Sequence, residues 1–263
     1  ERKTRKRAVA RLTSKDFLNW TGPVPMTFGS AGVIPPDQHY NNQTFPYFRA
    51  PHIYLALSAR FMEGRQALSD EAARKAGVPE GRWQDCSETI LMTSRGGAYY
   101  DRSFMEALIR PGPGPLNWVT RTNFALGGVV QTGPGEISLY LNRHNLHPSW
   151  HVRRYRLRLD GFASLHAPYK GGMALTKPIR FSGKELEINY STSAAGSVRV
   201  EILDSEGKPL PGFSAGECQE ILGDEIERVV AWKGGGDVST LADRPIRLRF
   251  VMKDADIYSF RFR

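Results

Sequence analysis

Two carboxylates three residues apart, Asp85 and Glu88, have the types and spacing best suited to acid–base chemistry. A carboxyl pair can supply a general acid and a nucleophile or base when both groups flank the same bond. Glu88 begins an apolar run, 88–94, with strand composition, and residues three apart in a strand point to opposite faces. We therefore expect one of the two acids to face a cleft. An ion pair with Arg82 or Arg95 is the structural alternative.

A histidine cluster has spacings of three and four residues, which would suit metal ligands on one face of a helix. Its members are His144, His147 and His151. Pro148 and the flanking loop and strand composition argue against a helix there. We therefore predict no metal and no cofactor.

Cysteine use, hydropathy and charge exclude several classes. Cys86 and Cys218 are too few for a disulfide framework or a metal box, so the compartment stays open, secreted and periplasmic locations included. No apolar run approaches the roughly 18 residues of a membrane span, so no membrane partner is expected. The formal charge is +9, and residues 1–11, with six Lys or Arg and one Glu, supply much of it. We expect a solvated terminus rather than a nucleic-acid site, and nucleic-acid binding is the third alternative for function.

The stretch from Gln43 to Asp101 predicts one antiparallel unit of four strands. Turn signals at Ala50-Pro51 and Arg95-Gly96-Gly97 join its outer pairs, and a polar excursion from Arg60 to Gln84 joins the middle two. That order of elements is typical of one propeller blade. The four runs with strand composition are Thr44–Arg49, His52–Ala59, Glu88–Ser94 and Ala98–Arg102.

The polar excursion contains one segment, Ala67–Gly77, that predicts a short helix. Ser69 is a suitable N-cap, and Gly77 a suitable end. This insertion is interpreted as a lid over a pocket or as a surface ornament. Trp83, which closes it, suits either stacking on a sugar or burial.

The unit partly recurs along the chain. Upstream, a strand at Ala8–Ser14, a turn at Lys15-Asp16 and the aromatic end Phe17–Trp20 match the second half of the central unit, with Ser14 aligned to Ser94. Downstream strands are expected at Phe124–Gln131, Ile137–Asn142 and His151–Leu159. From Tyr169 onward, short strands recur at a spacing of about ten residues, which is typical of a β-sandwich.

These runs resemble five-bladed β-propeller proteins of the glycoside-hydrolase type, the broad group around the inulinase, invertase and arabinanase families. More narrowly, they are similar to a bacterial set with a C-terminal β-sandwich. The resemblance rests on Ser14-Lys15-Asp16-Phe17-Leu18-Asn19-Trp20, Ser94-Arg95-Gly96-Gly97, Leu157–Phe162, Thr176-Lys177-Pro178, Val200–Asp204, Trp232-Lys233-Gly234 and Pro245–Phe250.

The resemblance implies an all-β chain made of the C-terminal blades of a five-bladed propeller, residues 1–166, followed by a β-sandwich, residues 167–263. The visible blades are too few for a closed ring. We therefore expect a portion of a longer protein, or a chain whose N-terminal edge pairs with a missing part or with another chain.

The resemblance also implies a carbohydrate substrate and hydrolysis of glycosidic bonds in the propeller pocket. A non-catalytic carbohydrate-binding or scaffold protein is the alternative, because paired acids are scarce. In such propellers the loops between blades face the pocket, which places Glu136 on the opposite rim. The expected catalytic acids are Asp85 and Glu88, and the expected substrate-binding residues are His39, Asn42, Gln43, Arg121, Asn123, Arg143 and His144.

Overall fold

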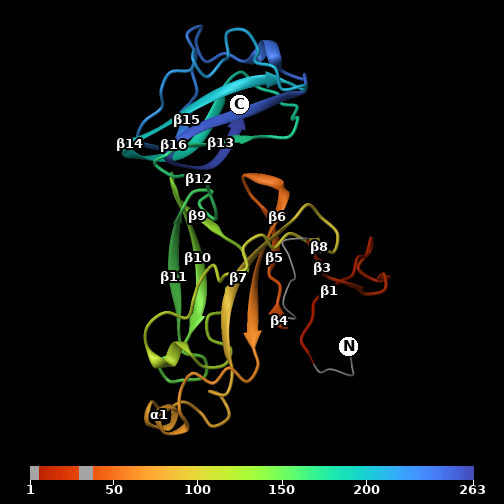
Figure 1. Ribbon diagram of the computed structural model, residues 1–263. Coiled ribbons are helices and arrows are strands. Elements are labelled where there is room, and N and C mark those ends of the chain that lie inside the picture. The colour runs from red at the N-terminus through yellow and green to blue at the C-terminus, as the bar shows by residue number, and fades with distance from the viewer. Residues whose placement is uncertain (1–5, 30–37) are drawn as a thin grey trace. The chain divides into compact units, whose positions relative to one another are not determined.

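The computed structural model describes residues 6–29 and 38–263 of the chain. The fold is all-β with several antiparallel sheets, as the strand patterns predict. The chain divides into two compact units (Figure 1): the first comprises residues 1–130 and 138–156, and the second 131–137 and 157–263. The division at residue 167, and the arrangement as propeller blades and a sandwich, stay predictions. No helix in the described part is long and apolar enough to cross a membrane.

The first unit is built on β6 (Ala50–Met62), a long strand that is paired on both edges. On one edge β5 (Thr44–Tyr47) pairs with its beginning and β4 (Gln38–Asn41) with its end. On the other edge β7 (Cys86–Ser94) runs antiparallel from Tyr54↔Ser94 to Met62↔Cys86. Apolar side chains of both strands, including Leu57 and Ile90, are fully buried.

The turn predicted at Ala50-Pro51 is wrong, and the strand predicted at Phe124–Gln131 shares only its last two residues with the observed strand Val130–Gly133. Ala50 and Pro51 lie in β6, and the turn falls on Phe48 and Arg49 instead. Proline is tolerated there because β6 is paired on its β5 side at Ala50 and again from Tyr54, which leaves Pro51 at an irregularity without a ladder partner.

Two hairpins of the first unit repeat the same local structure. The backbone amide of Thr21 donates to Thr13, and Thr93 and Asp101 exchange both backbone hydrogen bonds at positions 80 residues further on. In each hairpin a serine hydroxyl accepts from the amide two residues later, Ser14 from Asp16 and Ser94 from Gly96. The predicted alignment of Ser14 with Ser94 thus corresponds to equivalent geometry. The associated strands are β1 (Ala10–Arg11), β2 (Val24–Pro25), β3 (Thr27–Phe28) and β8 (Tyr99–Tyr100).

The insertion after β6 contains helix α1 (Asp70–Lys75), within the predicted range. Ser69 caps it, because its hydroxyl accepts from the Ala72 amide at 3.1 Å. Trp83 is fully buried and donates from Nε1 to Asp70 at 2.8 Å, so burial rather than stacking on a ligand describes it. A short 3-10 helix, η1 (Pro115–Asn117), follows further along the chain.

A separate sheet has the order β11-β10-β9. Its strands are β9 (Val130–Gly133), β10 (Glu136–Arg143) and β11 (His151–Arg158). Alternate apolar residues of β10, Ile137, Leu139 and Leu141, are fully buried, as the period of a half-buried strand requires.

The core of the second unit lies on a long antiparallel pair, β14 (Leu186–Asp204) and β16 (Ile246–Phe262). A bulge between Thr192 and Ser197 interrupts the pair. Any side chain on Gly196 there would meet the carbonyl oxygen of Asp254 at 2.2 Å. Trp232 is buried in this core and donates to the carbonyl oxygen of Val200. The remaining elements are β12 (Leu165–Ala167), β13 (Gly172–Leu175), β15 (Asp224–Val229) and the 3-10 helix η2 (Ser239–Leu241).

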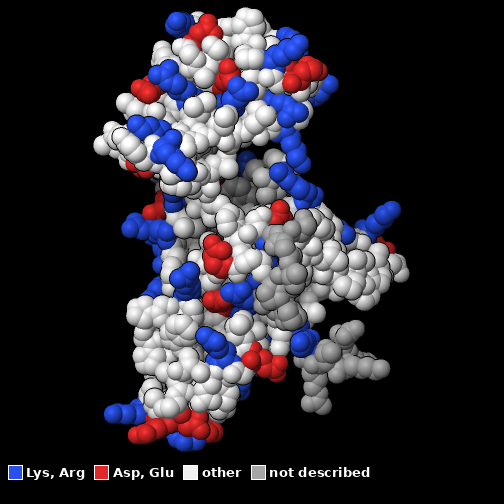
Figure 2. Space-filling view, in the orientation of Figure 1, with Lys and Arg blue, Asp and Glu red and all other residues white. Residues whose placement is uncertain are grey.

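Several charged residues on the second unit form ion pairs. Glu187 and Glu201, both nearly buried in β14, contact Arg261 and Arg249 of the neighbouring β16, each at 2.6 Å. Figure 2 shows Lys and Arg interspersed with Asp and Glu on the visible face. The two cysteines, Cys86 and Cys218, are buried and free.

Candidate functional site

Glu88 forms an ion pair with Arg60, which lies directly opposite it in the pairing of β6 and β7. The Glu88 and Arg60 side chains are 18% and 15% exposed, and Arg60 also donates to the Met105 carbonyl oxygen. The sequence suggested Arg82 or Arg95 as a partner, and that interpretation was wrong, because strand register brings Arg60 to Glu88 from 28 residues away. The ion pair between Glu88 and Arg60 therefore links β7 to β6, which is a structural role.

Asp85 is half-buried immediately before β7. Its carboxylate accepts from the Gly64 amide at 2.8 Å and from the Thr120 hydroxyl at 3.3 Å. Within the described residues it makes no ion pair, in contrast to Glu88. Of the two expected catalytic acids, Asp85 is therefore the one with a carboxylate not neutralised by an arginine.

Asn123 and Arg143, two expected substrate contacts, hydrogen-bond to each other in the interior. Asn123 is fully buried and Arg143 is 2% exposed. The Asn123 amide also donates to the carbonyl oxygens of Ser87 and Asn117, and Arg143 donates to that of Pro111. Burial lowers the pKa of the Arg143 guanidinium. These side chains tie loops to β7 and β10, and neither is open to a ligand.

The segments expected to meet at one site do lie together. Arg121 lies over the Tyr40 ring at 5.4 Å, and Tyr40 packs against Phe124 at 4.9 Å. The Thr122 hydroxyl accepts from the Asn145 amide, which brings the segment after β10 to the same place. Gln43 lies against Gly127, where an added Cβ would be 2.9 Å from its Oε1. These segments meet through packed side chains, and the contacts among them do not surround an open cleft.

His39 and His144 have protein partners as well. His39 is 4% exposed, contacts the Ser58 hydroxyl at 3.0 Å and stacks on Phe28. His144 contacts the Ser149 hydroxyl at 2.8 Å, and burial, followed by the charge of neighbouring His151, lowers its pKa. Within the described residues, no group of three or more His, Cys, Asp or Glu is placed to hold a metal ion.

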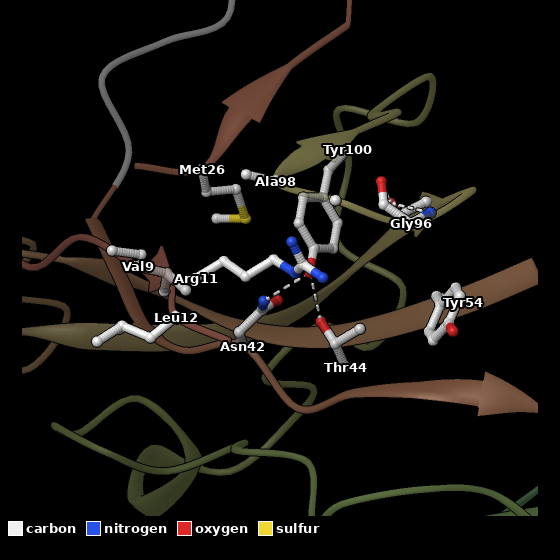
Figure 3. A pocket seen from close by; sticks show the side chains of 13 residues that line it. Val9, Arg11, Leu12, Met26, Asn42, Thr44, Tyr54, Gly96, Ala98 and Tyr100 are labelled. Atoms are coloured by element: carbon white, nitrogen blue, oxygen red, sulfur yellow. Dashed lines mark hydrogen bonds between the residues drawn. The ribbon is translucent and has the colours of Figure 1, made fainter. Parts of the chain in front are cut away.

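Asn42, the remaining expected contact, lines a cavity of about 360 Å³ in the first unit (Figure 3). We call it the Tyr100 pocket. The Tyr100 hydroxyl accepts from the Asn42 amide at 3.2 Å and lies 2.9 Å from the Thr44 hydroxyl. The side-chain oxygen of Asn42 has no hydrogen-bond partner among the described residues. The lining comprises Val9, Ala10, Arg11, Leu12, Met26, Asn42, Thr44, Tyr54, Ser94, Gly96, Gly97, Ala98 and Tyr100.

The two repeated hairpins form opposite walls of the Tyr100 pocket. Val9 to Leu12 come from the strand of the first hairpin, and Ser94, Gly96, Gly97 and Ala98 from the turn of the second. The remaining polar lining residues are Asn42, which follows β4, Thr44 at the start of β5, Tyr54 in β6 and Tyr100 in β8. A volume of about 360 Å³ is at the lower end of the range for small-molecule sites.

The chain matches no family model, no curated protein and no solved structure.

The pocket combines the groups that recognise a polyhydroxylated molecule. Hydroxyls of Thr44 and Tyr100 and the amide of Asn42 can donate and accept hydrogen bonds, and two tyrosine rings supply apolar faces. None of the described lining residues is acidic. The arrangement can bind such a ligand, but it offers no general acid or carboxylate nucleophile.

Sequence reasoning missed most of this pocket. Tyr100 fell only within the predicted strand Ala98–Arg102, and Arg11 was assigned to a solvated terminus. The sequence signal that could have located the pocket was the repeat of serine, turn and aromatic residue, because two copies of one hairpin can enclose a space between them. Their distance from each other is a tertiary property that neither copy encodes.

A second cavity, of about 820 Å³, lies in the second unit. Its charged lining includes residues of both signs, and Glu185 and Arg263 form an ion pair there at 3.0 Å. A role in sugar binding by this unit stays a prediction.

Proposed function

We propose that the chain binds a carbohydrate in the Tyr100 pocket without hydrolysing it there. The observation that supports this is a hydrogen-bonded group of three residues, Asn42, Thr44 and Tyr100. It presents an amide and two hydroxyls beside aromatic rings. The resemblance to carbohydrate-active propellers supports the same ligand class.

Titration calorimetry against a panel of methyl glycosides tests the proposal. We expect one class of sugar to bind, and Asn42→Leu or Thr44→Val to weaken it by about 5- to 10-fold per lost hydrogen bond. Thr240→Val is the matched control, because Thr240 is exposed in the second unit. Absence of binding by every sugar, or equal loss in the control, would reject the proposal.

Hydrolysis of glycosidic bonds is the second proposal, supported by the convergence of the segments that contain Asp85, Arg121 and His144. It needs a second carboxyl beside Asp85, since Glu88 is held by Arg60. Incubation with chromogenic glycosides tests it. Turnover that falls by about 10²-fold or more in Asp85→Asn would support it. Unchanged turnover in that variant would exclude Asp85 as a catalytic residue.

A further inference from the structure

We propose that the ligand of the Tyr100 pocket is an acidic saccharide, with its carboxylate bound by Arg11. This inference rests on the proposed carbohydrate binding and specifies the ligand class. Among the described lining residues, Arg11 is the one charged side chain. Figure 3 shows it reaching from the first hairpin into the pocket, toward Tyr100 and Thr44.

Arg11 is not occupied by a protein acid. Within the described residues it has no ion pair or hydrogen bond through its guanidinium, whereas other arginines of the same unit do. Arg60 is paired with Glu88, and Arg74 with Glu80. Arg11 is exposed and lines the cavity without a counter-charge, so its guanidinium favours an anion there, most strongly at low salt.

The other copy of the repeat has an apolar residue at the position equivalent to Arg11. The equivalent residue of the second hairpin, 80 positions further on, is Leu91, which is 6% exposed and packs in the core. At this position the first hairpin has an exposed cation that lines a cavity. Its backbone is held by pairing of Arg11 with Val24 and by the bond from the Met26 amide to Val9, so the side chain starts from a fixed point.

The geometry of the guanidinium selects carboxylate among anions of saccharides. Its planar fork can donate two parallel hydrogen bonds to one carboxylate. A uronate in the pocket would then place its ring hydroxyls toward Asn42 and Thr44. A neutral sugar of the same configuration would form the hydroxyl contacts alone, so the uronate should bind more tightly than the neutral sugar.

Paired ligands test this in the intact chain. Calorimetric titrations compare glucuronate with glucose and galacturonate with galactose, as methyl glycosides, at low and moderate salt. We expect the uronate to bind roughly 10- to 100-fold more tightly, the range of a hydrogen bond to a charged group. Arg11→Gln should abolish that preference and leave the neutral sugar unchanged. Arg11→Lys should restore part of it, because the charge returns without the fork.

Lys15→Gln is the control, since Lys15 is an exposed cation of the same hairpin that does not line the pocket. Thermal unfolding of each variant checks that the fold is retained. Equal affinity for acidic and neutral sugars would overturn the inference and leave the carbohydrate proposal standing. Absence of binding by either kind would overturn both. A uronate preference that Lys15→Gln removes and Arg11→Gln keeps would also overturn the inference.

Discussion

The guanidinium of Arg143 donates to the side-chain oxygen of Asn123 in the interior of the first unit, where both residues are almost fully buried. Their residue types suit substrate recognition, yet their partners are each other and the carbonyl oxygens of neighbouring loops. Substitution at either position is therefore expected to lower stability rather than to weaken ligand binding.

Replacing Asn123 with alanine should destabilise the protein rather than weaken a ligand. The change removes an acceptor from a buried charge and leaves carbonyl oxygens of Ser87 and Asn117 without their donor. We expect the free energy of unfolding in urea to fall by about 2–4 kcal/mol. Arg153→Ala, at an exposed arginine on β11, is the control and should change it by less than about 0.5 kcal/mol. An equally small change for Asn123→Ala would mean that the buried network contributes little.

Replacing Glu88 with glutamine separates a structural role from a catalytic one. Its carboxylate is bound by Arg60, so loss of the charge should lower the free energy of unfolding by about 1–3 kcal/mol. Any sugar affinity of the Tyr100 pocket should stay the same, because Glu88 is not among its lining residues. Glu106→Gln, at an exposed glutamate, is the control. A variant that keeps full stability and loses glycosidase turnover would instead make Glu88 catalytic.

Asp16 should make the first hairpin sensitive to acid. Its carboxylate accepts from the amides of Asn19 and Leu18 and from two side chains. These hydrogen bonds, that from the Asn19 amide foremost, hold the pKa of Asp16 well below its usual value near 4. A lowered folded pKa means that the stabilisation is present above pH 4 and is lost as pH falls through the folded pKa.

Amide chemical shifts of Leu18 and Asn19 measure that titration. We expect them to stay constant from pH 7 to 4 and to move only at lower pH. The Asp16→Asn variant should lose this acid transition. A midpoint near 4 in the unmodified chain would contradict the hydrogen-bonded geometry.

The two thiols should be unreactive in the folded protein. Burial raises the pKa of Cys86 to about 11 and that of Cys218 in the same direction, so little thiolate is present at pH 8. Reaction with a disulfide reagent should therefore require unfolding, after which both thiols react. Rapid modification of either cysteine without denaturant would show that it is more accessible than its position indicates.

Much of the local structure was predictable, because it depends on short-range chemistry. Ser69, Asp70 and Glu71 signal the start of α1 through the unsatisfied amides of a helix N-terminus, and the helix begins where they predict. Apolar runs located β6 and β7, since a strand must bury one or both faces. In the second unit the sequence predicted short strands about ten residues apart, whereas β14 and β16 are each one long strand. The Ser14 and Ser94 turns could be aligned because the same side chain meets the same amide in each.

The roles of polar residues needed the tertiary structure. Residue type suggests that Arg143, Asn123 and Glu88 contact a ligand, but burial and the partner decide whether they do. The partners lie 20 residues away for Arg143 and 28 for Glu88, and strand register sets them. Arg11 shows the converse, because its sequence context is that of a solvated basic terminus. By itself the sequence determined the all-β class, the strands and the serine turns, which arise from contacts between near neighbours. The placement of Arg11 at the same pocket as Asn42, Thr44 and Tyr100 was decided only when distant segments packed together.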